Sequence, residues 1–299
     1  MADPRFTGSG VALVTPFDDR GVNERALSAL VEFHLQEGTD ALIVCGSTGE
    51  AAAMSAEEQR VAAEVVVAAA GGRIPVIAGC GGSDTRQVSR LAEQAGAAGA
   101  DAILASAPPY NKPPQRGLLA HFRAILEAAD LPLIVYNVPG RAAVNILPET
   151  IAELALDARV IGVKEACGDL SQVAELARLV GGQLHIWSGN DDQTVPIMAL
   201  GGVGVISVLA NVAPADTHAL AAAFLAGDIA EARRLQLHYL PLIRELFAEP
   251  NPIPVKQAVA MLGFETGPLR LPLTASAPAV LARLERTLRE AGVAPVLLP

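Results

Sequence analysis

The stretch PVIAGCGGSDTRQVSRLAEQAGAAGADAILAS (75–106) decides the fold. It begins and ends with a continuous apolar run, PVIAGC (75–80) and AILAS (102–106). Between these runs, apolar residues recur every three or four positions, at Val88, Leu91, Ala92 and Ala95. Continuous apolar runs are typical of strands covered on both faces, and the three-to-four-residue repeat is typical of one helix face. The stretch therefore predicts two parallel strands joined by a helix.

The same alternation continues through most of the chain. Six further apolar runs are predicted strands: GVALVTPF (10–17), ALIVCG (41–46), LIVYNV (133–138), VIGVKEA (160–166), LHIWSG (184–189) and GVISV (204–208). Helical stripes lie between them, and Asn23 and the Ser55–Glu58 pair are typical helix-starting residues. Eight strand–helix units predict an α/β protein with a (β/α)8 barrel. The alternative, a doubly wound open sheet, would need a glycine-rich nucleotide-binding turn after the first strand, and TPFDDRG supplies none.

The residues after the eighth unit have no strand pattern. They hold three segments of amphipathic helical spacing, at 230–247, at 254–264 and near 277–291. We therefore expect a catalytic barrel over residues 1–225 and a C-terminal helical extension over 226–299. The proline-rich joint EPNPIP (249–254) separates two of these helices, and we do not interpret it as a domain linker.

Composition excludes several classes of protein. The chain has 299 residues, of which 51% are hydrophobic and 18% charged, which excludes a disordered protein, and its apolar runs are too short to span a membrane. A net charge of −10 argues against non-specific nucleic-acid binding. We expect no export signal, because the first residues lack a basic region and a long apolar run. The three cysteines, Cys45, Cys80 and Cys167, lack disulfide or metal spacing and predict reduced residues of a cytoplasmic protein.

Lys164 is the strongest candidate for a reactive group. It ends the run VIGVK, at the end of a predicted strand where barrels have their active sites, and the chain has only three lysines. Burial lowers the pKa of a lysine amine, so that it can form an imine with a carbonyl substrate. Alternatively, its amine reaches solvent or pairs with Glu165. Tyr136 ends the preceding strand, and adjacent strands lie about 5 Å apart, so its phenol can reach the Lys164 amine. Tyr110 follows the fourth predicted strand. Both tyrosines are candidates to transfer protons, and the alternative is that they are structural residues of the barrel wall.

Two further motifs are candidates for binding carboxylates. The turn GSTGE (46–50) offers the Ser47 and Thr48 hydroxyls and exposed backbone N–H groups, although many tight turns have this composition. Arg141 lies just past Tyr136 and is either a second carboxylate clamp or a surface arginine. The five histidines show no metal-ligand spacing, and no nucleotide-binding loop is present in the sequence, so we expect neither a metal nor another cofactor.

Taken in order, these motifs resemble the dihydrodipicolinate synthase / N-acetylneuraminate lyase superfamily. The resemblance extends from about Phe6 to Gly292 and rests on GSTGE (46–50), PPYNKP (108–113), YNVPGR (136–141), GVKEACGD (162–169), WSGND (187–191) and GVISV (204–208). The segments EPNPIPVKQA (249–258) and LRLPLT (269–274) resemble the synthase branch.

The resemblance implies a (β/α)8 barrel with a helical extension, assembled as a homotetramer that works without a cofactor. It implies that Lys164 forms the imine and that Tyr136, Ser47 and Tyr110 relay protons, with Tyr110 reaching across from a neighbouring subunit. Four further residues are implied to contact substrates. These are Thr48 for the pyruvate carboxylate, the Ile206 carbonyl for the bound keto acid, Arg141 for the carboxylate of the aldehyde substrate, and Gly189 beside it.

The synthase branch implies condensation of pyruvate with L-aspartate 4-semialdehyde to 4-hydroxy-tetrahydrodipicolinate, in lysine and diaminopimelate biosynthesis. The alternative is a sibling aldolase or dehydratase that acts on a sugar acid, N-acetylneuraminate or 4-hydroxy-2-oxoglutarate. Pro109 favours this alternative, and so does Ser47, because the synthases usually carry threonine at that position. A third hypothesis is a catalytically silent barrel that senses a keto acid, and the intact Lys164 and Tyr136 argue against it.

Feedback control is expected to differ from that of lysine-inhibited members of the family. Those members carry histidine, asparagine, glutamate and tyrosine at the positions of Ala56, Ser83, Gln87 and Pro109. Without a carboxylate at position 87, the ammonium group of lysine lacks its partner, so we expect weak or absent inhibition by lysine.

Overall fold

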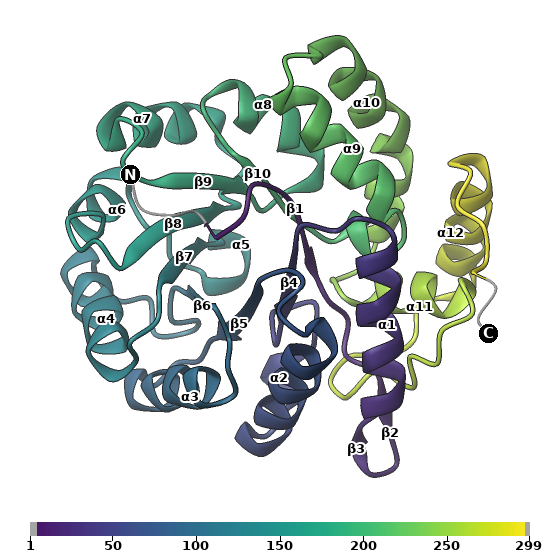
Figure 1. Ribbon diagram of the computed structural model, residues 1–299, viewed down its shortest axis with the longest axis horizontal. Coiled ribbons are helices and arrows are strands. Elements are labelled where there is room, and N and C mark those ends of the chain that lie inside the picture. Colours follow the sequence, from purple (N-terminus) through teal and green to yellow (C-terminus); the bar gives the residue numbers. More distant parts are fainter. Residues whose placement is uncertain (1–4, 297–299) are drawn as a thin grey trace.

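The computed structural model describes residues 5–296, so residues 1–4 of the predicted barrel range and 297–299 of the predicted extension lie outside it. Its centre is a closed barrel of parallel strands in the order β1-β10-β9-β8-β7-β6-β5-β4 (Figure 1). The strands are β1 (Gly8–Ala12), β4 (Ala41–Val44), β5 (Val76–Cys80), β6 (Ala102–Ser106), β7 (Leu133–Asn137), β8 (Val160–Glu165), β9 (His185–Ser188) and β10 (Gly204–Ser207). All eight predicted strands are therefore present, and the predicted (β/α)8 barrel is confirmed.

Helices surround the strands in a ring (Figure 1). They are α1 (Glu24–Gln36), α2 (Ala56–Ala70), α3 (Thr85–Ala97), α4 (Gln115–Ala128), α6 (Pro148–Leu154), α7 (Leu170–Val180), α8 (Thr194–Ala199) and α9 (Pro214–Leu225). The short helix α5 (Pro139–Ala142) and the 3-10 turns η1 (Ala51–Ala53), η2 (Asp191–Gln193) and η3 (Leu209–Asn211) each follow a barrel strand. The predicted helix starts are confirmed. The Asn23 side chain accepts from the Ala26 N–H, and Ser55 and Glu58 form a reciprocal capping box.

The first strand ends earlier than predicted. The run 10–17 suggested one strand, but β1 ends at Ala12, and Phe17 belongs to a small hairpin of β2 (Phe17–Asp18) and β3 (Gly21–Val22). The strand ends early because backbone groups after Ala12 bond to residues that are distant in the sequence. The Val14 N–H donates to the Asn211 side chain, and the Phe17 N–H donates to the Thr266 carbonyl. These partners satisfy the backbone outside the barrel ladder.

Two apolar layers hold the barrel together. Alternate strand residues, among them Ile43, Ile134 and Ile206, fill its interior together with the stacked rings of Phe6 and Trp187. Residues of the opposite strand faces, such as Leu42 and Val163, pack against the surrounding helices. Burial on both faces explains why the strands have continuous apolar sequences.

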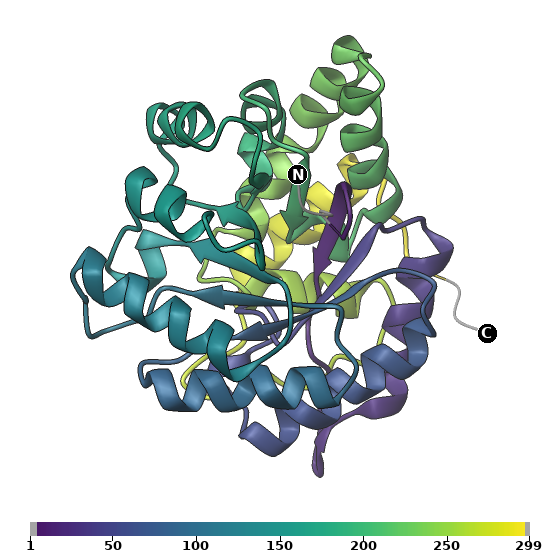
Figure 2. The ribbon, with the colours of Figure 1, turned by 60° about the vertical axis from the view of Figure 1, so that its left-hand side comes forward.

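The C-terminal residues form α10 (Ile229–Leu246), α11 (Ile253–Met261) and α12 (Pro278–Glu290). Figures 1 and 2 show these green-to-yellow helices together on one side of the barrel. They share an apolar core with Leu30 of α1 and Leu220 of α9, and Lys256 of α11 forms a buried 2.7 Å ion pair with Glu50 of the barrel. The predicted boundary at 225/226 falls between α9 and α10 and stays a prediction. No helix among the described residues is long and apolar enough to cross a membrane.

Candidate active site

A cavity of about 680 Å³ opens at the carboxyl ends of the strands. Six predicted site residues line it, namely Ser47, Thr48, Tyr136, Arg141, Lys164 and Gly189. They come from four strand ends. Ser47 and Thr48 follow β4, Tyr136 and Lys164 are the penultimate residues of β7 and β8, Arg141 follows β7, and Gly189 follows β9. This is the face on which barrel enzymes carry their active sites. Two predicted site residues, Tyr110 and Ile206, are not among the lining residues.

Lys164 is buried within this cavity. Its relative exposure is 5%, and burial lowers the pKa of its amine to about 8. The alternative that Lys164 pairs with Glu165 is wrong, because Glu165 bonds elsewhere, accepting from the Asn137 side chain at 3.0 Å and from the Cys167 N–H at 2.8 Å. The lysine is therefore a desolvated amine that loses its proton far more readily than an ordinary lysine.

Tyr136 lies directly beside the lysine. The two residues are register partners on β7 and β8, and the Lys164 Nζ is 4.5 Å from the centre of the Tyr136 ring. Burial raises the pKa of the Tyr136 phenol to about 12. The phenol therefore keeps its proton at neutral pH and can donate it to a substrate oxygen.

Two charged residues act on the Lys164 amine in opposite directions. After burial, the Asp191 carboxylate raises the pKa of Lys164 and the Arg141 guanidinium lowers it. Asp191 is fully enclosed and held in place, since it accepts from the Ser207 hydroxyl and from the backbone N–H groups of Val208 and Leu209. Asp191 stands in the WSGND motif and is a site residue that the sequence pattern alone does not reveal. The hydrogen bonds that hold its carboxylate near Lys164 come from residues 16 to 18 positions further along the chain.

The GSTGE turn has the geometry of an anion cradle. The N–H groups of Gly49 and Glu50 close the turn onto the carbonyls of Gly46 and Ser47. Within residues 5–296, the Ser47 and Thr48 N–H groups have no hydrogen-bond acceptor, so both can bind a carboxylate. Thr48 is 3% exposed, whereas Ser47 is exposed toward the cavity mouth.

Arg141 lies at the mouth of the cavity, on the short helix α5. Its guanidinium donates to the backbone carbonyl of Asn251 at 2.7 Å, and Asn251 in turn donates from Nδ2 to the Thr48 Oγ1 at 2.9 Å. Asn251 belongs to the EPNPIP joint, whose composition predicts only a connection between helices, and which lies between α10 and α11. The joint is also part of the cavity wall, which includes Pro250, Asn251 and Pro252.

Gly189 and Ile206 have different surroundings. A Cβ atom at Gly189 would lie 2.8 Å from the Ala166 Cβ and 3.1 Å from the Lys164 Cγ, so the glycine leaves room for the lysine side chain. Ile206 lies on β10 within the apolar interior of the barrel, fully buried and paired in register with Gly10. Its carbonyl as a substrate contact stays a prediction.

Tyr110 does not line the cavity of its own chain. Its side chain is 89% exposed, in sharp contrast to the other two tyrosines. The backbone at Tyr110 has φ +70°, a left-handed conformation that is rare for aromatic residues. The chain thus holds a large apolar side chain in solvent at the cost of local strain.

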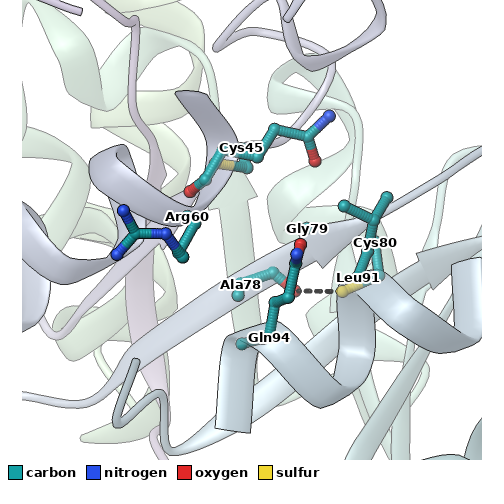
Figure 3. Close-up of a pocket in the computed structure, with 9 residues that line it drawn as sticks. Cys45, Arg60, Ala78, Gly79, Cys80, Leu91 and Gln94 are labelled. Atoms are coloured by element: carbon teal, nitrogen blue, oxygen red, sulfur yellow. Dashed lines mark hydrogen bonds between the residues drawn. The ribbon is translucent and has the colours of Figure 1, made fainter. Parts of the chain in front are cut away.

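Cys45 and Cys80 belong to the wall of the cavity, whereas the histidines are not among its lining residues. All three cysteines are free, and Cys45 and Cys80 also border a second, small cavity that is lined by residues of α2, β5 and α3 (Figure 3). Burial raises the pKa of the Cys45 thiol to about 12, as expected for an unreactive core residue. His34 and His121 are buried helix residues. Within residues 5–296, no group of three or more His, Cys, Asp or Glu side chains is placed to hold a metal ion.

Comparison with known proteins places this geometry in a family. The model of the Dihydrodipicolinate synthetase family matches residues 5–291. The chain belongs to this family. The family resemblance inferred from the strand-end motifs is thereby confirmed.

Individual relatives agree over nearly the whole chain. The chain is 52% identical, over 97% of its length and 98% of the relative's, to a 4-hydroxy-tetrahydrodipicolinate synthase of Thermoanaerobacter sp. (strain X514). The solved dihydrodipicolinate synthase of Aquifex aeolicus superposes with a TM-score of 0.95 at 41% identity, covering 98% of this chain and 100% of that one. A chloride-inhibited dihydrodipicolinate synthase of Acinetobacter baumannii, solved in complex with pyruvate, has a TM-score of 0.93 at 41% identity. The match covers 96% of this chain and 99% of that one.

Proposed function

We propose that this chain condenses pyruvate with L-aspartate 4-semialdehyde to give 4-hydroxy-tetrahydrodipicolinate, a lyase reaction of lysine and diaminopimelate biosynthesis. The observation that carries the proposal is the buried Lys164 amine, with a pKa lowered to about 8 and the Tyr136 ring 4.5 Å away, inside a cavity of about 680 Å³. The names of the curated relatives support the same reaction.

The chemistry follows from the amine of Lys164. Its neutral nitrogen attacks C2 of pyruvate, and loss of water gives an imine. Loss of a proton from the methyl group gives an enamine, whose carbon attacks the aldehyde carbon of the semialdehyde. The amino group of this adduct then attacks C2, closes the six-membered ring and releases Lys164. The imine itself accepts the electron pair, so the scheme needs no metal or other cofactor.

Protons must move at several of these steps. Tyr136 is placed to donate to the oxygen of pyruvate as water leaves, because its phenol stays protonated and lies beside Lys164. Ser47 and Tyr110 complete the proposed relay. Ser47 lies at the mouth of the same cavity and keeps the hydroxyl that threonine supplies in most synthases.

The two substrates each carry a carboxylate. The free N–H groups of Ser47 and Thr48 and the Thr48 hydroxyl suit the pyruvate carboxylate next to Lys164. Arg141, at the cavity mouth, suits the carboxylate of the semialdehyde, which enters second.

We further propose that the chain assembles as a homotetramer in the cytoplasm. The exposed, strained Tyr110 supports assembly, because a neighbouring subunit would bury its ring and use its hydroxyl in the relay. The three free cysteines fit a reducing compartment.

Reductive trapping tests the central step. Incubation with pyruvate and borohydride should add one pyruvate to each chain, and peptide mapping should locate it on Lys164. Lys164→Ala should give no adduct, and Lys112→Ala, which removes another lysine outside the cavity lining, should label normally. An unlabelled wild-type protein, or an adduct on another lysine, would contradict the proposal.

A further inference from the structure

We infer that Asn251 is a positioning residue of this site, whose side-chain amide directs the Thr48 hydroxyl proton toward the carboxylate of the keto acid. The inference deepens the proposed function and rests on it for the identity of that keto acid. Asn251 lies between α10 and α11, outside the barrel that supplies Lys164 and Tyr136.

The contacts of Asn251 join both proposed carboxylate-binding groups. Its side chain is in the cavity wall, and the residue is only 6% exposed. Nδ2 donates to the Thr48 Oγ1 at 2.9 Å, and its backbone carbonyl accepts from the Arg141 guanidinium at 2.7 Å. One residue of the C-terminal extension therefore fixes a group on each side of the cavity.

The hydrogen-bonding capacity of a hydroxyl gives this contact its direction. A threonine hydroxyl has one proton and two lone pairs, and an amide NH₂ group can only donate. The Asn251 amide therefore occupies a lone pair of Thr48 and leaves the hydroxyl proton unused. Among the described residues this proton has no acceptor, and Thr48 lines the cavity, so the proton is available to an anionic ligand there.

The side-chain oxygen of Asn251 supports a functional reason for asparagine at this position. The Asn251 Oδ1 is buried and lacks a hydrogen-bond partner among residues 5–296. An unpaired buried carbonyl oxygen lowers the stability of the folded state. Packing and stability alone therefore do not favour asparagine at this position, whereas a need for a fixed donor to Thr48 does.

The sharpest test exchanges the donor for an acceptor of the same shape. In Asn251→Asp, the carboxylate accepts a hydrogen bond from the Thr48 hydroxyl, which turns that proton away from the ligand, and adds a negative charge next to the carboxylate site. The pyruvate concentration for half-maximal imine trapping should rise about tenfold or more. Asn251→Ala only leaves the Thr48 hydroxyl free to rotate. This variant should therefore raise the half-maximal pyruvate concentration less than Asn251→Asp does. The amount trapped at saturating pyruvate should stay at one per chain in both variants, which shows that they are folded and that binding, not imine chemistry, has changed.

A double-mutant cycle with Thr48→Val separates positioning from general packing. In the Thr48→Val background, Asn251→Ala should cause no further loss of pyruvate affinity. If Asn251→Asp keeps the wild-type affinity for pyruvate, then Thr48 donates to residue 251 and not to the ligand. If Asn251→Ala lowers pyruvate affinity as much in the Thr48→Val background as in the wild type, then Asn251 acts independently of Thr48. Either result overturns the inference. Because trapping uses pyruvate alone, a failure with the semialdehyde would overturn the proposed overall reaction and leave this test intact.

Discussion

Lys164 and Tyr136 face each other across neighbouring strands, with the lysine Nζ 4.5 Å from the centre of the tyrosine ring. The parallel ladder of β7 and β8 sets this relationship, so it does not depend on a flexible loop. It places a nucleophile with a lowered pKa beside a proton donor with a raised pKa. Pairs of groups whose environments move their pKa values apart are typical of acid–base catalysis.

The first prediction concerns pH. Only the neutral amine of Lys164 attacks pyruvate, and its pKa is lowered to about 8. The rate of imine formation should therefore rise about tenfold per unit as pH increases toward 8, and level off above it. Trapping rates measured with pyruvate alone give this profile. A rate that falls as pH rises over that range would contradict the assignment.

Exchange of the two neighbouring charges should move that profile in opposite directions. Asp191 raises the pKa of Lys164 and Arg141 lowers it. Asp191→Asn should therefore shift the midpoint of the rate profile to lower pH, and Arg141→Met should shift it to higher pH. Shifts of the same sign in both variants would refute this electrostatic account.

Removal of the Tyr136 hydroxyl should slow turnover while leaving the fold intact. Tyr136→Phe is expected to lower kcat by about 10²-fold or more, because a positioned general acid contributes on that order. Tyr239→Phe is the matched control, since Tyr239 is buried outside the cavity and its hydroxyl donates to Asp216. Equal kcat values in the two variants would exclude Tyr136 from the relay.

Tyr110 should act on the neighbouring subunit. Its side chain is 89% exposed and does not line the cavity of its own chain. Tyr110→Ala and Lys164→Ala should each be inactive or nearly so. When the two variants are unfolded and refolded together, mixed assemblies should regain activity, because a chain with Lys164 then meets a partner with Tyr110. No recovery in verified mixed assemblies would show that Tyr110 does not act in trans.

Lysine should inhibit weakly or not at all. Ser83, Gln87 and Pro109 line the cavity, and the Ser83 hydroxyl donates to the Pro109 carbonyl at 3.1 Å. None of them offers a carboxylate to a lysine ammonium. Gln87→Glu should therefore increase sensitivity to lysine relative to the wild type. Inhibition of the wild type at sub-millimolar lysine would contradict this expectation.

Much of this architecture was predictable from the sequence, because local rules govern it. Burial on both faces makes each barrel strand a continuous apolar run, and the strand ends then place Lys164 and Tyr136 together. The early end of β1 was not predictable, since the partner of Val14 is Asn211, 197 positions away. Asn251 was missed for the same reason. Its segment has the composition of a helix connection, and only the fold brings it to Thr48, 203 positions away.

The measurement that tests the central claim most directly is turnover of pyruvate with L-aspartate 4-semialdehyde, followed by coupling to a reductase that consumes the product. The account predicts steady turnover that is lost in Lys164→Ala and reduced in Tyr136→Phe. Absence of turnover in a folded protein that still forms the Lys164 imine would contradict the proposed co-substrate and favour a sibling aldolase that acts on a sugar acid.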